Sequence, residues 1–528
     1  MEFLVGDKGR MPGGRSRVVI LATLVVVFVY RFYLLWRYSF RYLDGDSAVL
    51  WYATACYAHG NFPEPFFFGQ NYNMMIEALF AVPLYWLHVP LWAALPVASF
   101  FVAAAPFIIL SVITFRRNPL AGEIILLFPC FMGLEYDVLT SIPHPFFGGY
   151  FFAVVGGILF VECKNRWLHG LGMFLMVLGY IANATSVFVS TLFVLFCISD
   201  YFPQTGNERK FELPKLLCAL TGLLAGIALN FCFLYFYKLH PMANVNPLGG
   251  ISFNVDVFCK NFAGLKNLLA GFVFDDRLWF LFVIAYLAVA VHGALKCGWK
   301  SVLVSSVFLI MLGIFMAVPK TLDFEDRSLS FLFSQARMYL FLPLVLVVLL
   351  YLFSLVKVED CKLNLRFTSA VFLLEFVACV CCLFKVSQFN EIMQVEANKL
   401  TVSTLLPTST VRNVLKAAEF FRSESLRRNM NLIVVQPRCE TIVYTSAAIM
   451  YGDVDIYESR FDRREWIRKE LEKVLNDDTD VLLVFPEDGR STRKLTSAIV
   501  TVPAGDSIAH YVYYLWADTP PYQYLKQL

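Results

Sequence analysis

Long apolar runs recur along the chain and alternate with shorter polar segments. At 1.5 Å of rise per residue, a helix of about 20 apolar residues crosses the hydrocarbon core of a bilayer. By this length criterion the sequence predicts about eleven membrane-spanning helices. They lie near residues 18–36, 92–115, 119–137, 149–163, 168–182, 184–199, 214–237, 278–295, 301–318, 337–356 and 367–386. The pattern therefore predicts a polytopic α-helical membrane protein.

Composition supports this class. Hydrophobic residues make up 58% of the 528 residues, charged residues only 16%, and the mean hydropathy is +0.61. A soluble chain has nearer a quarter of charged residues. The net charge of +3 says nothing useful about nucleic acid, and most of the 13 cysteines fall inside apolar runs as small hydrophobic residues. No small-residue cleavage site follows the first span, so we expect a retained helix rather than a removed signal peptide.

Basic residues set the expected orientation, because positive loops favour the cytoplasmic side. With the N-terminus inside, every cluster falls on that side. The clusters are Lys8, Arg10, Arg15 and Arg17; Arg116 and Arg117; Lys164 and Arg166; Arg209, Lys210 and Lys215; Lys296 and Lys300; and Lys357, Lys362 and Arg366.

Two regions follow from this topology. Residues 1–386 form the predicted membrane domain, with a first outward loop at 37–91. The tail, 387–528, is richer in charge and alternates short strand and helix patterns, such as 431–436, 454–458 and 481–487. It predicts a small extracytoplasmic α/β domain.

Asp44 and Asp46 flank a glycine directly after the first span. Carboxylates at a membrane boundary are costly to desolvate and often functional, and one could take the proton from an attacking hydroxyl. A second interpretation is that an aspartate caps the helix that follows. The two interpretations are compatible, because one aspartate can cap while the other acts as a base.

Further polar side chains gather in the outward loops. Gln70, Tyr72 and Glu77 precede or begin an apolar segment at 74–87 that we expect to be interfacial; they either contact a sugar or acceptor, or solvate the helix end. Asp137 and His144 stand in the second outward loop, and two prolines flank the histidine. Both are candidates for acceptor contact or for a second acid-base role, and loop capping and helix-end solvation are the structural alternatives.

Several motifs resemble one known family. The first span, the acidic turn, the stretch 66–72 (FFFGQNY), the helix 76–87 (IEALFAVPLYWL) and the segment 334–349 (SQARMYLFLPLVLVVL) are similar to multi-spanning GT-C glycosyltransferases. The likeness is to the branch related to protein O-mannosyltransferases and to bacterial transferases that use polyprenyl-phosphate sugars. It covers residues 18–200 and resumes at 334–349.

The resemblance implies a transferase that moves a sugar from a polyprenyl-phosphate donor to an acceptor hydroxyl on the outer face. It implies Asp46 as general base, with Asp44 as the next candidate, because Ser47 replaces the second acid of the family pair. Arg337, with Tyr339 beside it, matches the basic position that meets the donor phosphate; a guanidinium suits that contact, although snorkelling to the interface explains it equally. A single displacement would invert the anomeric carbon, and no cofactor is required.

Other classes remain open at this stage. One alternative is a lipid or solute transporter or flippase, which predicts internal repeats and helices broken at mid-membrane. Another is an inactive relative that binds a partner, since Ser47 stands where the family has an acid. No phosphate-binding glycine loop and no zinc-ligand spacing occurs, and a divalent ion at Asp44 or Asp46 has no support in the sequence.

We expect a bacterial inner membrane, with the endoplasmic reticulum as the alternative. The sugar and the acceptor class (lipid, glycan or protein) are not indicated.

Overall fold

The structure is a computed structural model that describes most of the membrane region. The described residues are 14–43, 45–198, 213–241, 252–273, 275–319, 335–355 and 365–397, together with 409–412, 415, 432–435, 455–458, 481–486, 499–503 and 510–515 in the tail.

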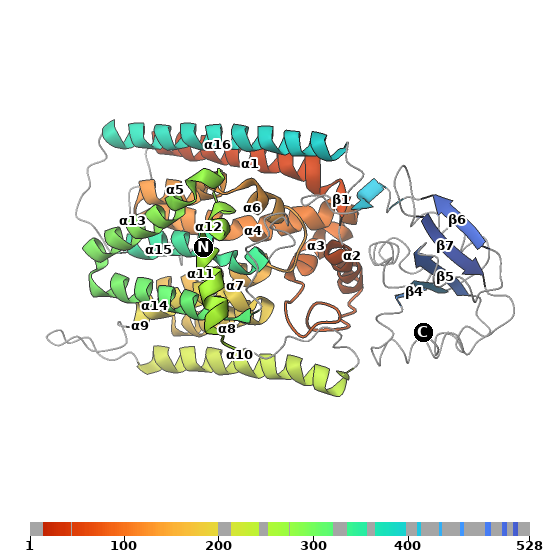
Figure 1. The fold of residues 1–528 in the computed structure, drawn as a ribbon. Coiled ribbons are helices and arrows are strands. Elements are labelled where there is room, and N and C mark those ends of the chain that lie inside the picture. Colours follow the sequence, from red (N-terminus) through yellow and green to blue (C-terminus); the bar gives the residue numbers. More distant parts are fainter. Residues whose placement is uncertain are drawn as a thin grey trace.

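A helical bundle forms the larger part of the molecule (Figure 1). Its α-helices are α1 (Gly14–Leu34), α2 (Gly45–Ala58), α3 (Ile76–Trp86), α4 (Leu91–Phe115), α5 (Pro119–Phe131), α6 (Leu134–Leu139), α7 (Phe147–Glu162), α8 (Arg166–Ala182), α9 (Val187–Ile198), α10 (Leu213–Leu239), α11 (Val255–Ala263), α12 (Leu265–Ala270), α13 (Phe280–Cys297), α14 (Trp299–Met316), α15 (Phe341–Ser354) and α16 (Leu365–Ala397). Shorter turns are η2 (Leu35–Ser39), η3 (Ala184–Ser186), η5 (Asp276–Leu278) and η7 (Gln335–Tyr339). In Figure 1, α1 and α16 run side by side along one edge of the bundle, and α10 lies along the opposite edge.

Six helices within the described residues are long and apolar enough to cross a membrane. They are Leu91–Phe115, Leu213–Leu239, Phe280–Cys297, Trp299–Met316, Arg337–Ser354 and Leu373–Glu391. These helices indicate that the chain is a multi-pass membrane protein. The predicted number of about eleven spans is not confirmed, because several expected spans are shorter helices: α5, α7, α8 and α9.

Two expected boundaries differ in detail. The span predicted at 119–137 ends as α5 at Phe131, and a separate short helix, α6, begins at Leu134. Pro129 lies in the last turn of α5, where a proline favours the end of a helix. The domain boundary predicted after residue 386 falls inside α16, which continues to Ala397.

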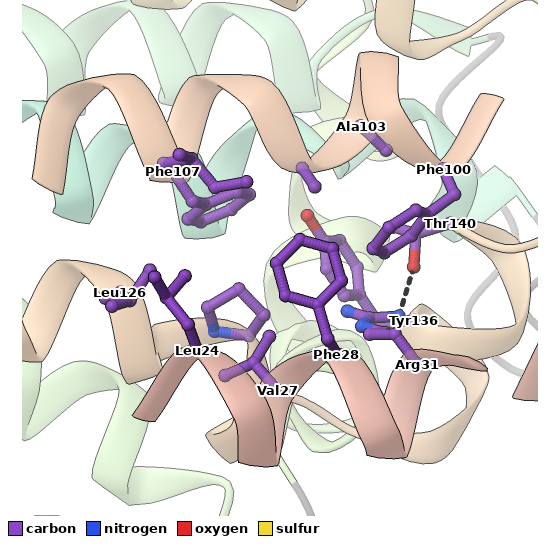
Figure 2. A pocket seen from close by; sticks show the side chains of 13 residues that line it. Leu24, Val27, Phe28, Arg31, Phe100, Ala103, Phe107, Leu126, Tyr136 and Thr140 are labelled. Carbon is purple, nitrogen blue, oxygen red and sulfur yellow. Dashed lines mark hydrogen bonds between the residues drawn. The ribbon is translucent and has the colours of Figure 1, made fainter. Parts of the chain in front are cut away.

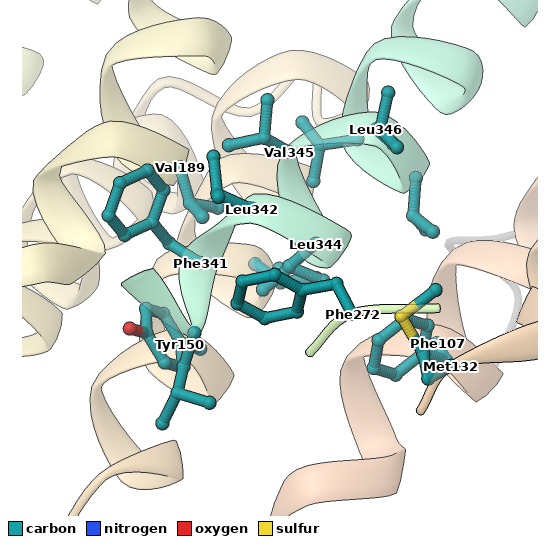
Figure 3. Close-up of a cluster of buried hydrophobic side chains, with 14 of the residues drawn as sticks. Phe107, Met132, Tyr150, Val189, Phe272, Phe341, Leu342, Leu344, Val345 and Leu346 are labelled. Carbon is teal, nitrogen blue, oxygen red and sulfur yellow. The ribbon is translucent and has the colours of Figure 1, made fainter. Parts of the chain in front are cut away.

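The central helix of the bundle is α15. All but one of its 14 residues are buried, and its apolar side chains pack on every side against neighbouring helices. Figure 3 shows Phe341, Leu342 and Val345 in this cluster with Val189 of α9 and Tyr150 of α7. A helix that is apolar all round belongs in such a core.

Helix α10 is apolar but faces outward. Only 17% of its most apolar window is buried, and large apolar side chains such as Leu224 and Phe231 are more than 60% exposed. Exposure on this scale suits contact with lipid rather than water.

An apolar pocket of about 30 Å³ opens between α1, α4 and α5. Figure 2 shows Phe28 and Phe107 along it, and Arg31 at one end donating a hydrogen bond to Thr140. None of the predicted site residues lines it, so this pocket is separate from the candidate site.

The described part of the tail holds a five-stranded mixed sheet in the order β4-β3-β5-β7-β6. Its strands are β3 (Leu432–Val435), β4 (Asp455–Glu458), β5 (Val481–Pro486), β6 (Ile499–Pro503) and β7 (His510–Leu515). Strands β3, β4 and β5 are parallel neighbours and match three predicted strands, whereas β6 and β7 were not predicted. Of the two helices predicted in the tail, only the first turn of one, near Val411, falls partly within the described residues.

A second, two-stranded sheet joins the tail to the segment between η2 and α2. Strand β1 (Tyr42–Leu43) pairs antiparallel with β2 (Ser409–Thr410), and the Val411 N–H donates to the Arg41 carbonyl at 2.8 Å. The start of the tail is therefore held three residues before Asp46 in the chain.

Candidate functional site

Asp46 lies in the first turn of α2, which begins at Gly45. An acidic side chain is favourable there, because the unpaired N–H groups give a helix N-terminus a partial positive charge. The Asp46 side chain is 47% exposed, whereas the neighbouring Ser47 is fully buried. Asp46 is therefore the group that α2 presents to its surroundings. Asp44, the other predicted aspartate, lies outside the described residues.

Ser47 fixes α2 to the segment between α6 and α7. Its hydroxyl donates to the Pro143 carbonyl at 3.0 Å. The amide of Asn183, at the end of α8, donates to the Phe146 carbonyl at 2.8 Å. These bonds hold the turn 143–148, which carries His144, between α2 and α8.

The turn brings His144 beside Asp46. The imidazole Nδ1 lies 3.6 Å from the Asp46 Oδ2, and only 3% of the histidine side chain is exposed. The His144 ring also stacks on Phe146, with centroids 5.1 Å apart and planes inclined by 12°. The candidate base and the buried imidazole thus form one pair at the edge of the bundle.

Arg337 approaches the same place from another part of the chain. It lies in η7, directly before the central helix α15, and its guanidinium carbon is 5.8 Å from the centre of the Phe146 ring. This distance is within the range of a cation–π contact. The single ring of Phe146 therefore contacts both His144 and Arg337.

The pKa of Tyr72 responds to the charges of both Asp46 and Arg337. Partial burial raises the pKa of Tyr72, the Arg337 charge lowers it, and the Asp46 charge raises it. A phenol that senses both groups lies near both of them. The structure thus places Asp46, His144 and Arg337 around the turn 143–148, and the charges of Asp46 and Arg337 both act on Tyr72.

Glu77 binds the backbone of the turn that carries His144. It is fully buried in α3, and its Oε1 accepts the N–H groups of Phe147 and Gly148, both at 2.8 Å. Burial raises the pKa of Glu77 to about 7, while these hydrogen bonds and the nearby His144 charge lower it. Glu77 therefore contacts the backbone of the turn rather than the open side of the site.

The remaining predicted residues are placed differently. Tyr339 is fully buried beside Phe315 and Phe341, so its ring belongs to the core next to Arg337. Gln70 is partly buried in the loop before α3, where its N–H donates to the Phe67 carbonyl.

Asp137 is held in the interior of the bundle. Its carboxylate forms an ion pair with Arg31 at 2.8 Å, and its Oδ2 accepts hydrogen bonds from Lys385 and from the Tyr30 hydroxyl. Asp137 and Lys385 are both fully buried. These contacts join α6 to α1 and α16 and give Asp137 partners within the protein, away from the Asp46 centre.

Phe146 is the site residue that the sequence did not single out. An aromatic residue in an apolar chain carries no signal of its own, since 16% of all residues are aromatic. Its neighbours Pro143 and Pro145 gave the only hint, because they marked a fixed turn.

Metal ligands do not gather at this centre. Within the part of the chain that the structure describes, no group of three His, Cys, Asp or Glu side chains could hold a metal ion.

No protein-family model matches the sequence, and no curated protein matches it. Two solved structures are similar in fold. ArnT from Cupriavidus metallidurans in the apo state matches with a TM-score of 0.50 and 13% identity, over 94% of this chain and 97% of that chain. ArnT from the same organism bound to undecaprenyl phosphate matches with a TM-score of 0.53 and 11% identity, over 96% of this chain and 99% of that chain. The likeness shows that the chain shares the ArnT fold along almost its whole length.

Proposed function

We propose that this protein is a membrane glycosyltransferase that takes its sugar from a polyprenyl-phosphate carrier. The observation that carries the proposal is the meeting of Asp46 and Arg337 around the turn 143–148, a carboxylate and a guanidinium from distant segments. The fold shared with ArnT, one structure of which holds undecaprenyl phosphate, supports a lipid phosphate as the ligand.

Arg337 provides the contact for the donor phosphate. A guanidinium offers two parallel N–H donors to phosphate oxygens, and it keeps its charge at any physiological pH. Its guanidinium carbon lies 5.8 Å from the centre of the Phe146 ring, which places the charge beside the turn that carries His144. Tyr72, which senses the same charge, lies where it can border the phosphate or the sugar.

Asp46 acts as the general base. Its partly exposed carboxylate takes the proton from an acceptor hydroxyl as that oxygen attacks the anomeric carbon. The bond from that carbon to the phosphate oxygen breaks, and the electron pair leaves on the lipid phosphate. The leaving group is a stable anion paired with Arg337, so the step needs no cofactor. One displacement inverts the anomeric centre.

The proposed site faces outward if the N-terminus is cytoplasmic, and the acceptor is then a lipid, glycan or protein on the outer side of a bacterial inner membrane. Ser47 occupies the position of the second family acid, but it is buried and bonded to Pro143, so it serves the geometry of the turn. A single carboxylate at position 46 is sufficient for the mechanism above.

The test is transfer from synthetic polyprenyl-phosphate sugars, offered as a panel of hexoses and pentoses, by purified protein in lipid nanodiscs. We expect Asp46→Asn to lower kcat by about 100-fold or more while donor binding is retained. We expect Arg337→Gln to raise the KM for the donor. Matched controls are Asp256→Asn and Arg277→Gln, which change exposed charges on α11 and η5.

Equal transfer by Asp46→Asn and by the wild type would remove Asp46 from the role of base. Movement of the labelled lipid across the bilayer with no sugar transfer from any donor would favour a flippase instead.

A further inference from the structure

The three side chains Asp46, His144 and Glu77 lie in an order of increasing burial. The Asp46 carboxylate is 47% exposed, the His144 side chain 3%, and Glu77 not at all. The imidazole meets Asp46 at 3.6 Å on its exposed side, and the Glu77 carboxylate acts on it electrostatically from the interior. His144 thus has one acid 3.6 Å away on its exposed side, and a second, buried acid binds the backbone of the same turn.

The two carboxylate oxygens of Glu77, the inner acid, differ in their hydrogen bonding. The Glu77 Oε1 accepts the two backbone N–H groups of α7, but its buried Oε2 has no hydrogen-bond partner within the described residues. A buried carboxylate oxygen without a donor is costly unless the carboxyl group is protonated or a nearby positive charge compensates it. His144, three residues before the backbone that Glu77 binds, is the titratable group placed to supply that charge.

We propose that Asp46, His144 and Glu77 form a carboxylate–imidazole–carboxylate chain in which His144 orients the base and receives the proton that Asp46 has taken up. This inference rests on the proposed function, since it assigns the path of the proton in that reaction. His144 acts through Asp46 and is therefore a positioning residue.

The proton balance is simple. The acceptor O–H bond breaks and an O–H bond forms on Asp46. That bond breaks in turn as an N–H bond forms on the His144 Nδ1, which leaves Asp46 ionised and the imidazole positive beside Glu77. After the product leaves, the imidazolium returns its proton through Asp46 to water.

Other charged groups act on the same chain. Arg337, above the Phe146 ring on which His144 stacks, disfavours a positive imidazole, whereas Asp46 on α2 and Glu77 on α3 favour it. Tyr72, in the loop before α3, senses Asp46 and Arg337. A bound donor phosphate would neutralise Arg337 and so make proton uptake by His144 easier at the moment of transfer.

The first experiment is the pH dependence of kcat for sugar transfer. His144 must be neutral to accept a proton, so wild-type kcat should rise with pH as the imidazole loses its proton. We expect His144→Gln to lower the maximum by about 10-fold or more and to abolish this rise. Glu77→Gln removes the inner charge, so the rise should move to lower pH.

Ser47→Ala is the matched control. It removes the hydrogen bond that holds Pro143 but keeps all three titratable groups, so any loss of rate should leave the midpoint unchanged. A pH profile of His144→Gln that superimposes on the wild-type profile, apart from its height, would overturn the inference.

A second measurement is independent of transfer. The midpoint of the His144 titration, followed by NMR on histidine-labelled protein in nanodiscs, should move to lower pH in both Asp46→Asn and Glu77→Gln. An unchanged midpoint in both variants overturns the proposed Asp46–His144–Glu77 arrangement, even if sugar transfer is confirmed. If the midpoints move but the protein uses no donor, the carboxylate–imidazole–carboxylate arrangement is supported and the proposed function is wrong.

Discussion

The guanidinium of Arg337 lies 5.8 Å from the centre of the Phe146 ring, and the same ring stacks on His144. Phe146 thus connects the residue proposed to bind phosphate with the pair that contains the proposed base. The distance between a phosphate contact and a base decides whether an acceptor oxygen can reach the anomeric carbon, because reacting atoms must approach to about 3–3.5 Å.

Phe146→Leu should therefore impair transfer more than its small change in apolar volume suggests. A cation–π contact is worth about 0.5–2 kcal/mol, so we expect kcat/KM to fall by about 2- to 30-fold. Steady-state kinetics in nanodiscs measures this. Phe151→Leu, in α7, is the control, because its ring contacts Phe80 rather than the site. Equal losses in the two variants would mean that Phe146 serves general packing.

Glu77 should make the stability of the protein depend on pH. Because burial raises its pKa from 4.5 to about 7, the folded state holds this proton more tightly than the unfolded state. The contribution of Glu77 to stability is then greatest below about pH 4.5 and declines as pH rises towards 7, by a total of about 3 kcal/mol. We expect Glu77→Gln, whose carbonyl can still accept both N–H groups, to become more stable than the wild type as pH rises. Thermal unfolding from pH 5 to pH 8 measures the difference, with Asp256→Asn as the control at an exposed site; a constant difference across this range would contradict the prediction.

Because Asp137 pairs with two buried cations, we expect two substitutions in this cluster to differ in their cost to stability. Asp137→Asn leaves the charges of Arg31 and Lys385 buried without an anion, which should cost about 3–5 kcal/mol. Lys385→Met leaves one cation facing one anion and should cost far less. Thermal unfolding in detergent or nanodiscs compares them. A larger loss in Lys385→Met would show that the lysine, not the charge balance, holds α16 in place.

The pairing of β1 with β2 predicts that the tail influences the Asp46 loop. Val411→Pro removes the N–H that donates to the Arg41 carbonyl, a bond worth about 1 kcal/mol, and a proline disrupts the strand pair. We expect lower kcat and faster proteolysis after α16. Val411→Ala keeps the N–H and loses only buried apolar surface, so it is the matched control. Identical kcat values in the two variants would show that the strand pair does not act on the site.

Some features of the site could be predicted from sequence because they depend on local order in the chain. Asp46 directly follows the first span, and it lies at the start of α2 as an N-terminal acid should. Arg337 directly precedes a strongly apolar run and lies at the entry to α15. By contrast, nothing in the sequence relates His144 to Asp46 or Phe146 to Arg337, because these contacts join separate segments through the packing of several helices. Asp137 and Glu77 look like exposed loop acids in the sequence, and only the structure gives them buried partners.

The sequence by itself determined that the chain forms apolar helices suited to a membrane, because a bilayer demands long apolar runs and charged residues are excluded from them. It could not decide where each helix lies. Helices α10 and α15 have the same hydropathy of 2.1 in their most apolar windows, yet the first is 17% buried and the second 83%. Lipid tails and a protein core are equally apolar, so hydropathy does not distinguish them. Only the tertiary packing placed α15 at the centre, and with it placed Arg337 at Phe146.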